Sequence, residues 1–145
     1  MATLDELRES WKTDCHLDSD DMAKSTLNSP QLHSRYLHEL ITYKLKLAKI
    51  HNEVAQYLVK RTKYYRGEMT REELLESGWE QWTYKTLKSE IDQLIEASSE
   101  FQQLSMREAY TKTCIYFLES VLQEVKTRSF HVKNMIEWHK FRAGG

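Results

Sequence analysis

Apolar residues recur at steps of three and four along most of the chain, and the clearest run lies between Pro30 and Gly67. In this run one helical face carries Tyr36, Leu40, Tyr43, Leu47, Ile50, Val54, Tyr57, Arg61 and Tyr64. Such spacing is typical of a helix that packs along one edge against other helices. Ser29-Pro30 suits the start of this helix and Gly67 suits its end, and no glycine or proline lies between. We therefore predict one unbroken helix, about 54 Å long at about 1.5 Å per residue.

A helix of this length cannot bury its apolar face inside a compact monomer. The pattern therefore predicts an elongated hairpin, an oligomer, or both.

Shorter elements are predicted on both sides of this run. Thr3 and Glu6 form a capping-box pattern ahead of a short helix with a narrow apolar face, which we interpret as an arm that docks on something else rather than a core element. Residues 14–28 are polar and acidic and are interpreted as a linker with room for a helical turn. Thr70 and Glu73 repeat the capping-box pattern ahead of a short acidic turn that ends at Gly78.

Helical spacing continues to the end of the chain. A third helix is predicted from about Trp79, with an interruption at Ser98-Ser99 and an apolar face formed by Tyr84, Leu87, Ile91, Leu94 and Phe101. A fourth is predicted from about Leu104 to Lys126, followed by a break at 127–129. An amphipathic segment then runs from Phe130 to Phe141.

We find no alternating strand pattern and no internal repeat. The sequence therefore predicts an all-α fold of long, hairpin-like helices with a C-terminal amphipathic helix. Its segments are an N-terminal short helix with an acidic linker (1–29), a helical core with the long helix (30–126), and a C-terminal segment (127–145). A chain of 145 residues is expected to form a single domain.

Composition supports this interpretation. The chain has four glycines and one proline, so it holds few helix breakers. No apolar run reaches the length of a membrane span, and the first residues lack the apolar core of a signal peptide. We therefore expect a soluble, intracellular protein that does not contact membranes. Cys15 and Cys114 form no motif and are predicted to be reduced thiols, with Cys114 a small core residue.

The net charge of −1 hides four blocks of alternating sign. Residues 1–29 carry a net charge of −4, residues 30–67 of +6, residues 68–104 of −6 and residues 105–145 of +3. Separated blocks of this kind can create a local positive surface for nucleic acid. They can also attract one another within or between subunits, and the sequence leaves both interpretations open.

The long helix carries its basic residues on an edge beside the apolar face. This edge includes Lys46, Lys49, Lys60 and Lys63, and it ends at Tyr64-Tyr65. Cations that precede aromatic rings suit single-stranded nucleic acid, because phosphates pair with cations and bases stack on rings. The alternative is that the charges form an ordinary solvated helix face.

Motifs for catalysis or metal binding are missing from the sequence. There is no phosphate-binding glycine loop and no dinucleotide-binding turn. The six histidines show neither HExxH nor pairing with a CxxC motif, and Cys15-His16 are adjacent, which is poor geometry for two ligands of one metal. We therefore predict no enzyme activity, no cofactor and no metal, with an accessory role to a nuclease as a remote third class.

Two stretches resemble a known family. These are Leu58–Gly67, LVKRTKYYRG, and Val125–Gly144, VKTRSFHVKNMIEWHKFRAG. Together with the chain length and the order of segments, they resemble the UvsY family, the recombination mediators of large tailed phages. Family members carry a Leu-Lys-x-Arg motif ahead of a double tyrosine. Here Leu58 and Arg61 match this motif, whereas Val59 stands at the lysine position and the lysine follows at Lys60.

The resemblance implies a homo-oligomeric ring of about seven subunits that acts in the cytoplasm of the infected host cell. It implies binding to single-stranded DNA and loading of a RecA-type phage recombinase, similar to UvsX, onto a strand covered by the phage single-stranded DNA-binding protein. The basic edge and the resemblance together predict the DNA-binding residues Lys46, Lys49, Lys60, Arg61, Lys63, Tyr64, Tyr65 and Arg66. The implied oligomerisation residues are Phe130, Val132, Met135, Ile136, Trp138 and Phe141. The alternative function is a structural coiled-coil or scaffolding adaptor without DNA binding.

Overall fold

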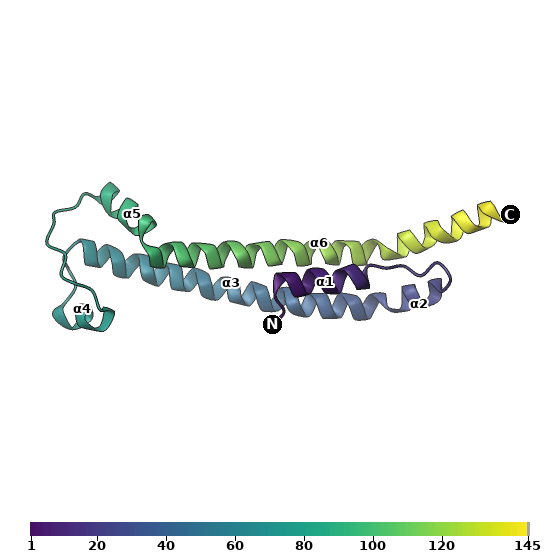
Figure 1. The fold of residues 1–145 in the computed structure, drawn as a ribbon, viewed down its shortest axis with the longest axis horizontal. Coiled ribbons are helices and arrows are strands. Elements are labelled where there is room, and N and C mark those ends of the chain that lie inside the picture. The colour runs from purple at the N-terminus through teal and green to yellow at the C-terminus, as the bar shows by residue number, and fades with distance from the viewer. Residues whose placement is uncertain (145) are drawn as a thin grey trace. The chain divides into compact units, whose positions relative to one another are not determined.

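The computed structural model describes residues 1–144, and every regular element among them is a helix. The helices are α1 (Leu4–Asp14), α2 (Met22–Leu27), α3 (Ser29–Tyr65), α4 (Arg71–Ser77), α5 (Lys88–Ala97) and α6 (Ser99–Arg142) (Figure 1). They pack into two compact units. The first unit contains Met1–Leu45 and the chain from Thr111 onward, and the second contains Lys46–Tyr110, so α3 and α6 contribute to both.

The predicted long helix is confirmed as α3. It ends in a Schellman motif, in which the Gly67 N–H donates to the Tyr64 carbonyl at 3.0 Å and the Glu68 N–H donates to the Lys63 carbonyl at 3.1 Å. Gly67 has a φ of +71°, a left-handed conformation that glycine adopts without steric cost. The predicted apolar face is also confirmed, because none of its nine residues is exposed.

α3 begins at Ser29, one residue before the predicted first helical residue Pro30, but the segment that precedes it differs from the prediction. The segment predicted to be a linker contains α2, and Asn28 at the end of α2 accepts a hydrogen bond from the Leu32 N–H at 3.0 Å. This bond belongs to the first turn of α3, in which Pro30 is the second residue. Proline is tolerated at this point because the first turn of a helix leaves its N–H groups without intrahelical partners.

The first unit has a core in which α1, α3 and α6 meet. Its buried residues are Leu7, Leu32, Tyr36, Leu40, Tyr43, Cys114, Leu118, Val121, Leu122 and Val125. The capping box of Thr3 and Glu6 is confirmed at the start of α1. The expectation that α1 lies outside the core was wrong, because Leu7 is only 3% exposed and the Trp11 ring contacts the Tyr36 ring edge-on at 5.6 Å. The narrow apolar face of α1 is therefore sufficient to pack against α3 of the same chain.

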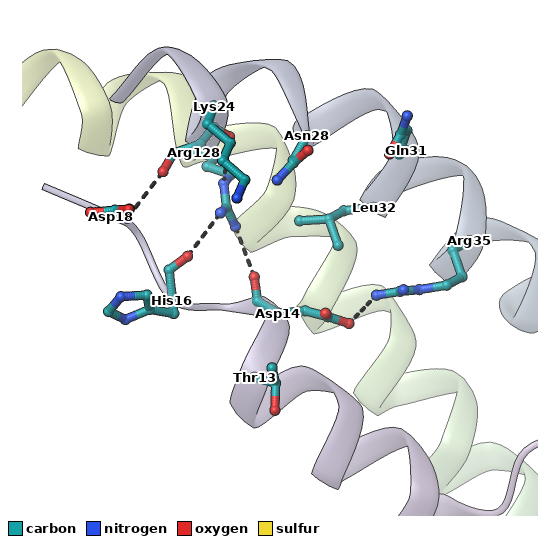
Figure 2. A pocket seen from close by; sticks show the side chains of 11 residues that line it. Thr13, Asp14, His16, Asp18, Lys24, Asn28, Gln31, Leu32, Arg35 and Arg128 are labelled. Atoms are coloured by element: carbon teal, nitrogen blue, oxygen red, sulfur yellow. Dashed lines mark hydrogen bonds and ion pairs between the residues drawn. The ribbon is translucent and has the colours of Figure 1, made fainter. Parts of the chain in front are cut away.

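A buried arginine holds the connection between α1 and α2 against α6. Arg128 is 5% exposed, and its guanidinium donates to the carbonyls of Ser25 at 3.2 Å, Asp14 at 3.1 Å and His16 at 3.0 Å. Figure 2 shows the carbonyls of Asp14 and His16 beside the guanidinium. Because Asp14 is the last residue of α1, the charge also lies at the negative end of that helix dipole.

Asp14 links the same region to α3. Its carboxylate accepts hydrogen bonds from Arg35 and, at 2.7 Å, from the Tyr36 hydroxyl. Burial and this hydrogen bond raise the pKa of the Tyr36 hydroxyl above its ordinary value. Asp14 and Arg128 thus link the end of α1 to α3 and α6 through side-chain hydrogen bonds.

α6 is longer than predicted at both ends. The predicted interruption at Ser98 is confirmed, since this residue is extended and separates α5 from α6, but α6 then begins at Ser99 and not near Leu104. The predicted break at 127–129 was wrong. The Thr127 hydroxyl donates to the Glu124 carbonyl at 3.1 Å, so the residue bonds within the helix instead of ending it. The segment boundary predicted at 127 therefore falls inside α6.

In the second unit, α3 and α6 run antiparallel, and charged side chains link the two helices. Glu53 pairs with Arg107 at 2.9 Å, and His51 contacts Glu108 at 2.8 Å. The capping of α4 by Thr70 and its end at Gly78 agree with the prediction.

The predicted start of the third helix at Trp79 was wrong. Residues 79–87 are not helical, and α5 begins only at Lys88, where the Leu87 N–H donates to the Glu90 carboxylate at 3.0 Å. The non-helical path lets the Trp79 and Trp82 side chains pack on the end of α3. Tertiary contacts thus override the local helical spacing. Among residues 1–144, no helix combines the length and apolarity that a bilayer crossing needs.

Candidate nucleic-acid interface

The basic end of α3 is covered by a cluster of aromatic rings. We call Tyr64, Tyr65, Trp79, Trp82 and Tyr84 the aromatic cluster. Ring centroids lie 5.1 Å apart for Tyr64 and Tyr65, 5.1 Å for Tyr64 and Trp79, 4.9 Å for Tyr65 and Trp82, and 5.0 Å for Trp82 and Tyr84. The rings form a connected series from α3 to the 79–87 segment, with Ile91 and Ile95 of α5 buried in the same core.

The guanidinium of Arg61 contacts residues of its own chain. Its guanidinium lies 3.7 Å from the centroid of the Trp79 ring and donates to the Glu100 carboxylate at 2.8 Å. Its Nε donates to the Tyr57 hydroxyl at 3.0 Å, and that hydroxyl donates to Glu100 at 2.6 Å. Hydrogen bonds from Tyr57 and Arg61 hold the pKa of the Glu100 carboxyl below its usual value. Arg61 therefore joins α3 to α6 and to the 79–87 segment.

Lys63 also has an internal partner. Its Nζ lies 2.9 Å from both carboxylate oxygens of Glu73 in α4. This hydrogen bonding lowers the pKa of the Glu73 carboxyl. The interpretation that oppositely charged blocks pair within the chain is therefore correct for Lys63 and Arg61.

Other basic residues of the predicted site face solvent. Lys49, Lys60 and Arg66 are exposed, whereas Lys46 is half-buried. The Nζ of Lys60 lies 4.8 Å from the centroid of the Trp79 ring, so this lysine and the ring form a cation–π contact at the surface. Lys60 is thus held beside an aromatic ring.

The two predicted stacking rings are buried. Tyr64 and Tyr65 are each 9% exposed, and the Tyr64 hydroxyl donates to the Glu80 carbonyl. Trp79 packs on Tyr64 and Trp82 packs on Tyr65, so neither tyrosine ring presents an open face to a base. The 79–87 segment therefore packs on Tyr64 and Tyr65 through its tryptophans.

Two residues that helical spacing predicts on a packed face lie at the surface. Tyr84 is 70% exposed and Leu87 is 69% exposed, although helical spacing placed both on an apolar stripe. Lys85 and Lys88 beside them are exposed as well. The available signal in the sequence was the aromatic-rich run WEQWTYKTLK, which has no acidic residue between Trp82 and Lys88.

The predicted oligomerisation residues lie near the end of α6. Phe130, Ile136, Trp138 and Phe141 are exposed, Met135 is half-buried, and the rings of Trp138 and Phe141 stack at 5.8 Å. Val132 is 6% exposed, so the chain itself already covers this residue. Val132 and Ile136 line a shallow groove with Met22, Ala23, Thr26 and Leu27 of α2.

No group of three or more histidine, cysteine, aspartate or glutamate side chains among residues 1–144 is arranged to hold a metal ion. The fold and the site define an all-helical protein with exposed cations and aromatic rings at one end of a long helix.

The model of the family described as "Recombination, repair and ssDNA binding protein UvsY" matches residues 10–145. The chain therefore belongs to the UvsY family. It is 24% identical to the recombination protein uvsY of Enterobacteria phage T4 over 141 residues, which are 97% of this chain and 98% of that protein.

Solved structures show the same fold. The crystal structure of the bacteriophage T4 recombination mediator protein UvsY in lattice type II matches with a TM-score of 0.84 at 22% identity, over 99% of each chain. The same protein in lattice type I matches with a TM-score of 0.81 at 21% identity, over 94% of this chain and 98% of the other. The all-helical architecture is thus shared along nearly the whole length.

Proposed function

We propose that this protein is a recombination mediator that binds single-stranded DNA. In this role it promotes loading of a RecA-type recombinase, similar to UvsX, onto a strand covered by the phage single-stranded DNA-binding protein. The observation that carries the proposal is the family membership over residues 10–145 together with the exposed cations Lys49, Lys60 and Arg66 on α3. The process requires no chemical step, so the protein acts as a binding protein in the cytoplasm of the infected cell and not as an enzyme.

A few exposed cations on one helix give modest, salt-sensitive binding to a strand segment. Repetition of the site in a homo-oligomer raises the effective concentration, so that weak sites sum to firm binding. Weak individual contacts also let a recombinase replace the mediator along the strand. We therefore propose a ring of about seven subunits, in keeping with the resemblance.

DNA binding is tested by fluorescence anisotropy of a labelled single-stranded oligonucleotide at several salt concentrations. We expect affinity to fall steeply with salt, and we expect Lys49→Gln with Lys60→Gln to reduce the salt slope by about 1.4 per protomer, because two phosphate contacts are lost. Arg61 is left intact, since its removal would disturb the fold.

The matched control is Lys12→Gln with Lys126→Gln, which removes two exposed lysines of the first unit. This control should leave the slope close to that of the wild type. If the wild-type protein does not bind the oligonucleotide at any salt concentration, the mediator proposal is wrong and the adaptor function takes its place.

Assembly is tested on the exposed rings at the end of α6. Phe141 is 73% exposed, and an apolar ring in that setting is stabilised when a second subunit covers it. We expect Phe141→Asp to lower the molar mass measured by light scattering to that of smaller species, because a buried carboxylate opposes the contact. The control is Met106→Asp, also 73% exposed and on the same helix. An unchanged mass for Phe141→Asp would place the assembly surface elsewhere.

A further inference from the structure

The 79–87 segment presents one aromatic ring to solvent. Tyr84 is 70% exposed, whereas the other rings of the aromatic cluster are buried or half-buried. Its ring contacts Trp82 at a centroid distance of 5.0 Å and an interplanar angle of 63°. The ring is therefore supported from one side, and most of its surface remains accessible.

The support beneath Tyr84 is fixed by contacts on both sides of it in the chain. The Trp82 Nε1–H donates to the Thr86 hydroxyl at 2.9 Å, which closes a short turn around Tyr84. The Trp82 ring packs on Tyr65 at 4.9 Å and lies 6.1 Å from Tyr64. Because Tyr64 and Tyr65 belong to α3, the exposed ring is held in place by the double tyrosine. An ordered ring loses little conformational entropy when a flat ligand stacks on it.

Two exposed cations follow this ring closely in the chain, within a segment that is acidic overall. Lys85 and Lys88 are exposed, and no acidic residue lies between Trp82 and Lys88. At the other end of the aromatic cluster, Lys60 lies over Trp79. A flat ring beside cations matches the two recurring parts of a single-stranded nucleic acid, which are the base and the phosphate.

We propose that Tyr84 is a base-stacking platform for single-stranded DNA, with Lys85 and Lys88 contacting the neighbouring phosphates. This inference rests on the proposed function and assigns the stacking role to a residue outside the double tyrosine. Tyr64 and Tyr65 then serve as positioning residues that hold the platform through Trp82. The proposed strand contact extends the cationic edge of α3 onto the 79–87 segment within the second unit.

The test separates stacking from charge. We expect Tyr84→Ala to weaken binding of a short labelled oligonucleotide by roughly 5- to 100-fold, while the salt slope stays that of the wild type, because stacking releases no counterions. Tyr84→Trp should preserve the affinity. Lys85→Gln with Lys88→Gln should instead reduce the slope by about 1.4.

The matched control is Tyr116→Ala, because Tyr116 is 72% exposed and belongs to the first unit. Its affinity should equal that of the wild type. If the wild type binds and Tyr84→Ala binds equally well, the stacking inference is wrong while the proposed function stands. If the wild type does not bind, the proposed function itself fails.

A direct readout is photo-cross-linking to an oligonucleotide that carries 5-iododeoxyuridine, followed by mass spectrometry of the peptides. We expect the cross-link on the peptide that contains Tyr84. A cross-link on Tyr64 or Tyr65 alone would overturn the inference, because it would show that the strand displaces the 79–87 segment and reaches the double tyrosine.

Discussion

Tyr64→Ala is expected to lower the free energy of unfolding by about 4 kcal/mol, which is the usual cost of truncating a buried aromatic side chain. Tyr64 contacts the rings of Tyr65 and Trp79 at 5.1 Å each. Its removal leaves a cavity between α3 and the 79–87 segment, and the rings on either side of that cavity lose their contact. Chemical denaturation followed by circular dichroism measures the change.

Two further variants make the result specific. Tyr64→Phe loses only the hydrogen bond to the Glu80 carbonyl, so the expected cost is about 1 kcal/mol. Tyr84→Ala removes an exposed ring and should change stability by no more than about 0.5 kcal/mol. Tyr84 would then act on DNA affinity alone, whereas Tyr64 would act on stability and, through the position of Trp82, on affinity as well.

The opposite pattern would contradict this assignment. If Tyr64→Ala unfolds at the same denaturant concentration as the wild type but loses affinity for single-stranded DNA, Tyr64 is a direct contact. The prediction made from the sequence, in which the double tyrosine stacks with bases, would then hold.

Arg128→Met is expected to lower the free energy of unfolding by about 3 kcal/mol. Replacement of a buried charge by an apolar side chain is often neutral when both partners are replaced together. Here the acceptors are backbone carbonyls of Asp14, His16 and Ser25, which no side-chain substitution removes. Each buried carbonyl without a donor costs about 1–3 kcal/mol, so the loss of several donors at once is destabilising.

Hydrogen exchange locates the effect of this substitution. We expect faster amide exchange in α1 and α2 of Arg128→Met, because the guanidinium fixes the connection between these helices, while the amides of residues 46–110 exchange as in the wild type. Arg128→Lys should give an intermediate loss, since one ammonium cannot reproduce the planar set of donors.

The control for Arg128 is Lys126→Met on the same helix. Lys126 is exposed, and its replacement should leave both stability and exchange unchanged within about 0.5 kcal/mol. If Arg128→Met exchanges in α1 like the wild type, the hydrogen bonds of Arg128 do not hold the N-terminal arm.

Local rules were sufficient for much of the fold. The spacing of apolar residues predicted α3 and its packed face, and the glycine at position 67 predicted its end. The capping patterns at Thr3 and Thr70 predicted the starts of α1 and α4. Each of these features depends on residues within a few positions of one another, which is why the sequence alone was sufficient.

Prediction was less accurate where distant segments meet. Helical spacing placed Tyr84 and Leu87 on a packed face. In the structure residues 79–87 are not helical, and Trp79 and Trp82 pack on the tyrosines of α3 instead. The predicted break near Thr127 did not occur, because a hydroxyl can bond within a helix as well as end one. The predicted roles of Arg61 and Lys63 were also incomplete. Their partners, Glu100 and Glu73, belong to other helices, so helical spacing around α3 could not reveal them.

The sequence by itself determined that this protein is helical, where its long helix ends, and that cations and tyrosines gather at that end. Only the tertiary structure decided which of these groups face solvent. Helical periodicity defines a face, but the segments that pack against that face decide whether a ring is buried or exposed. For this reason Tyr64 and Tyr65 became core residues and Tyr84 became a surface ring, and Arg128 became the buried attachment point of the N-terminal arm.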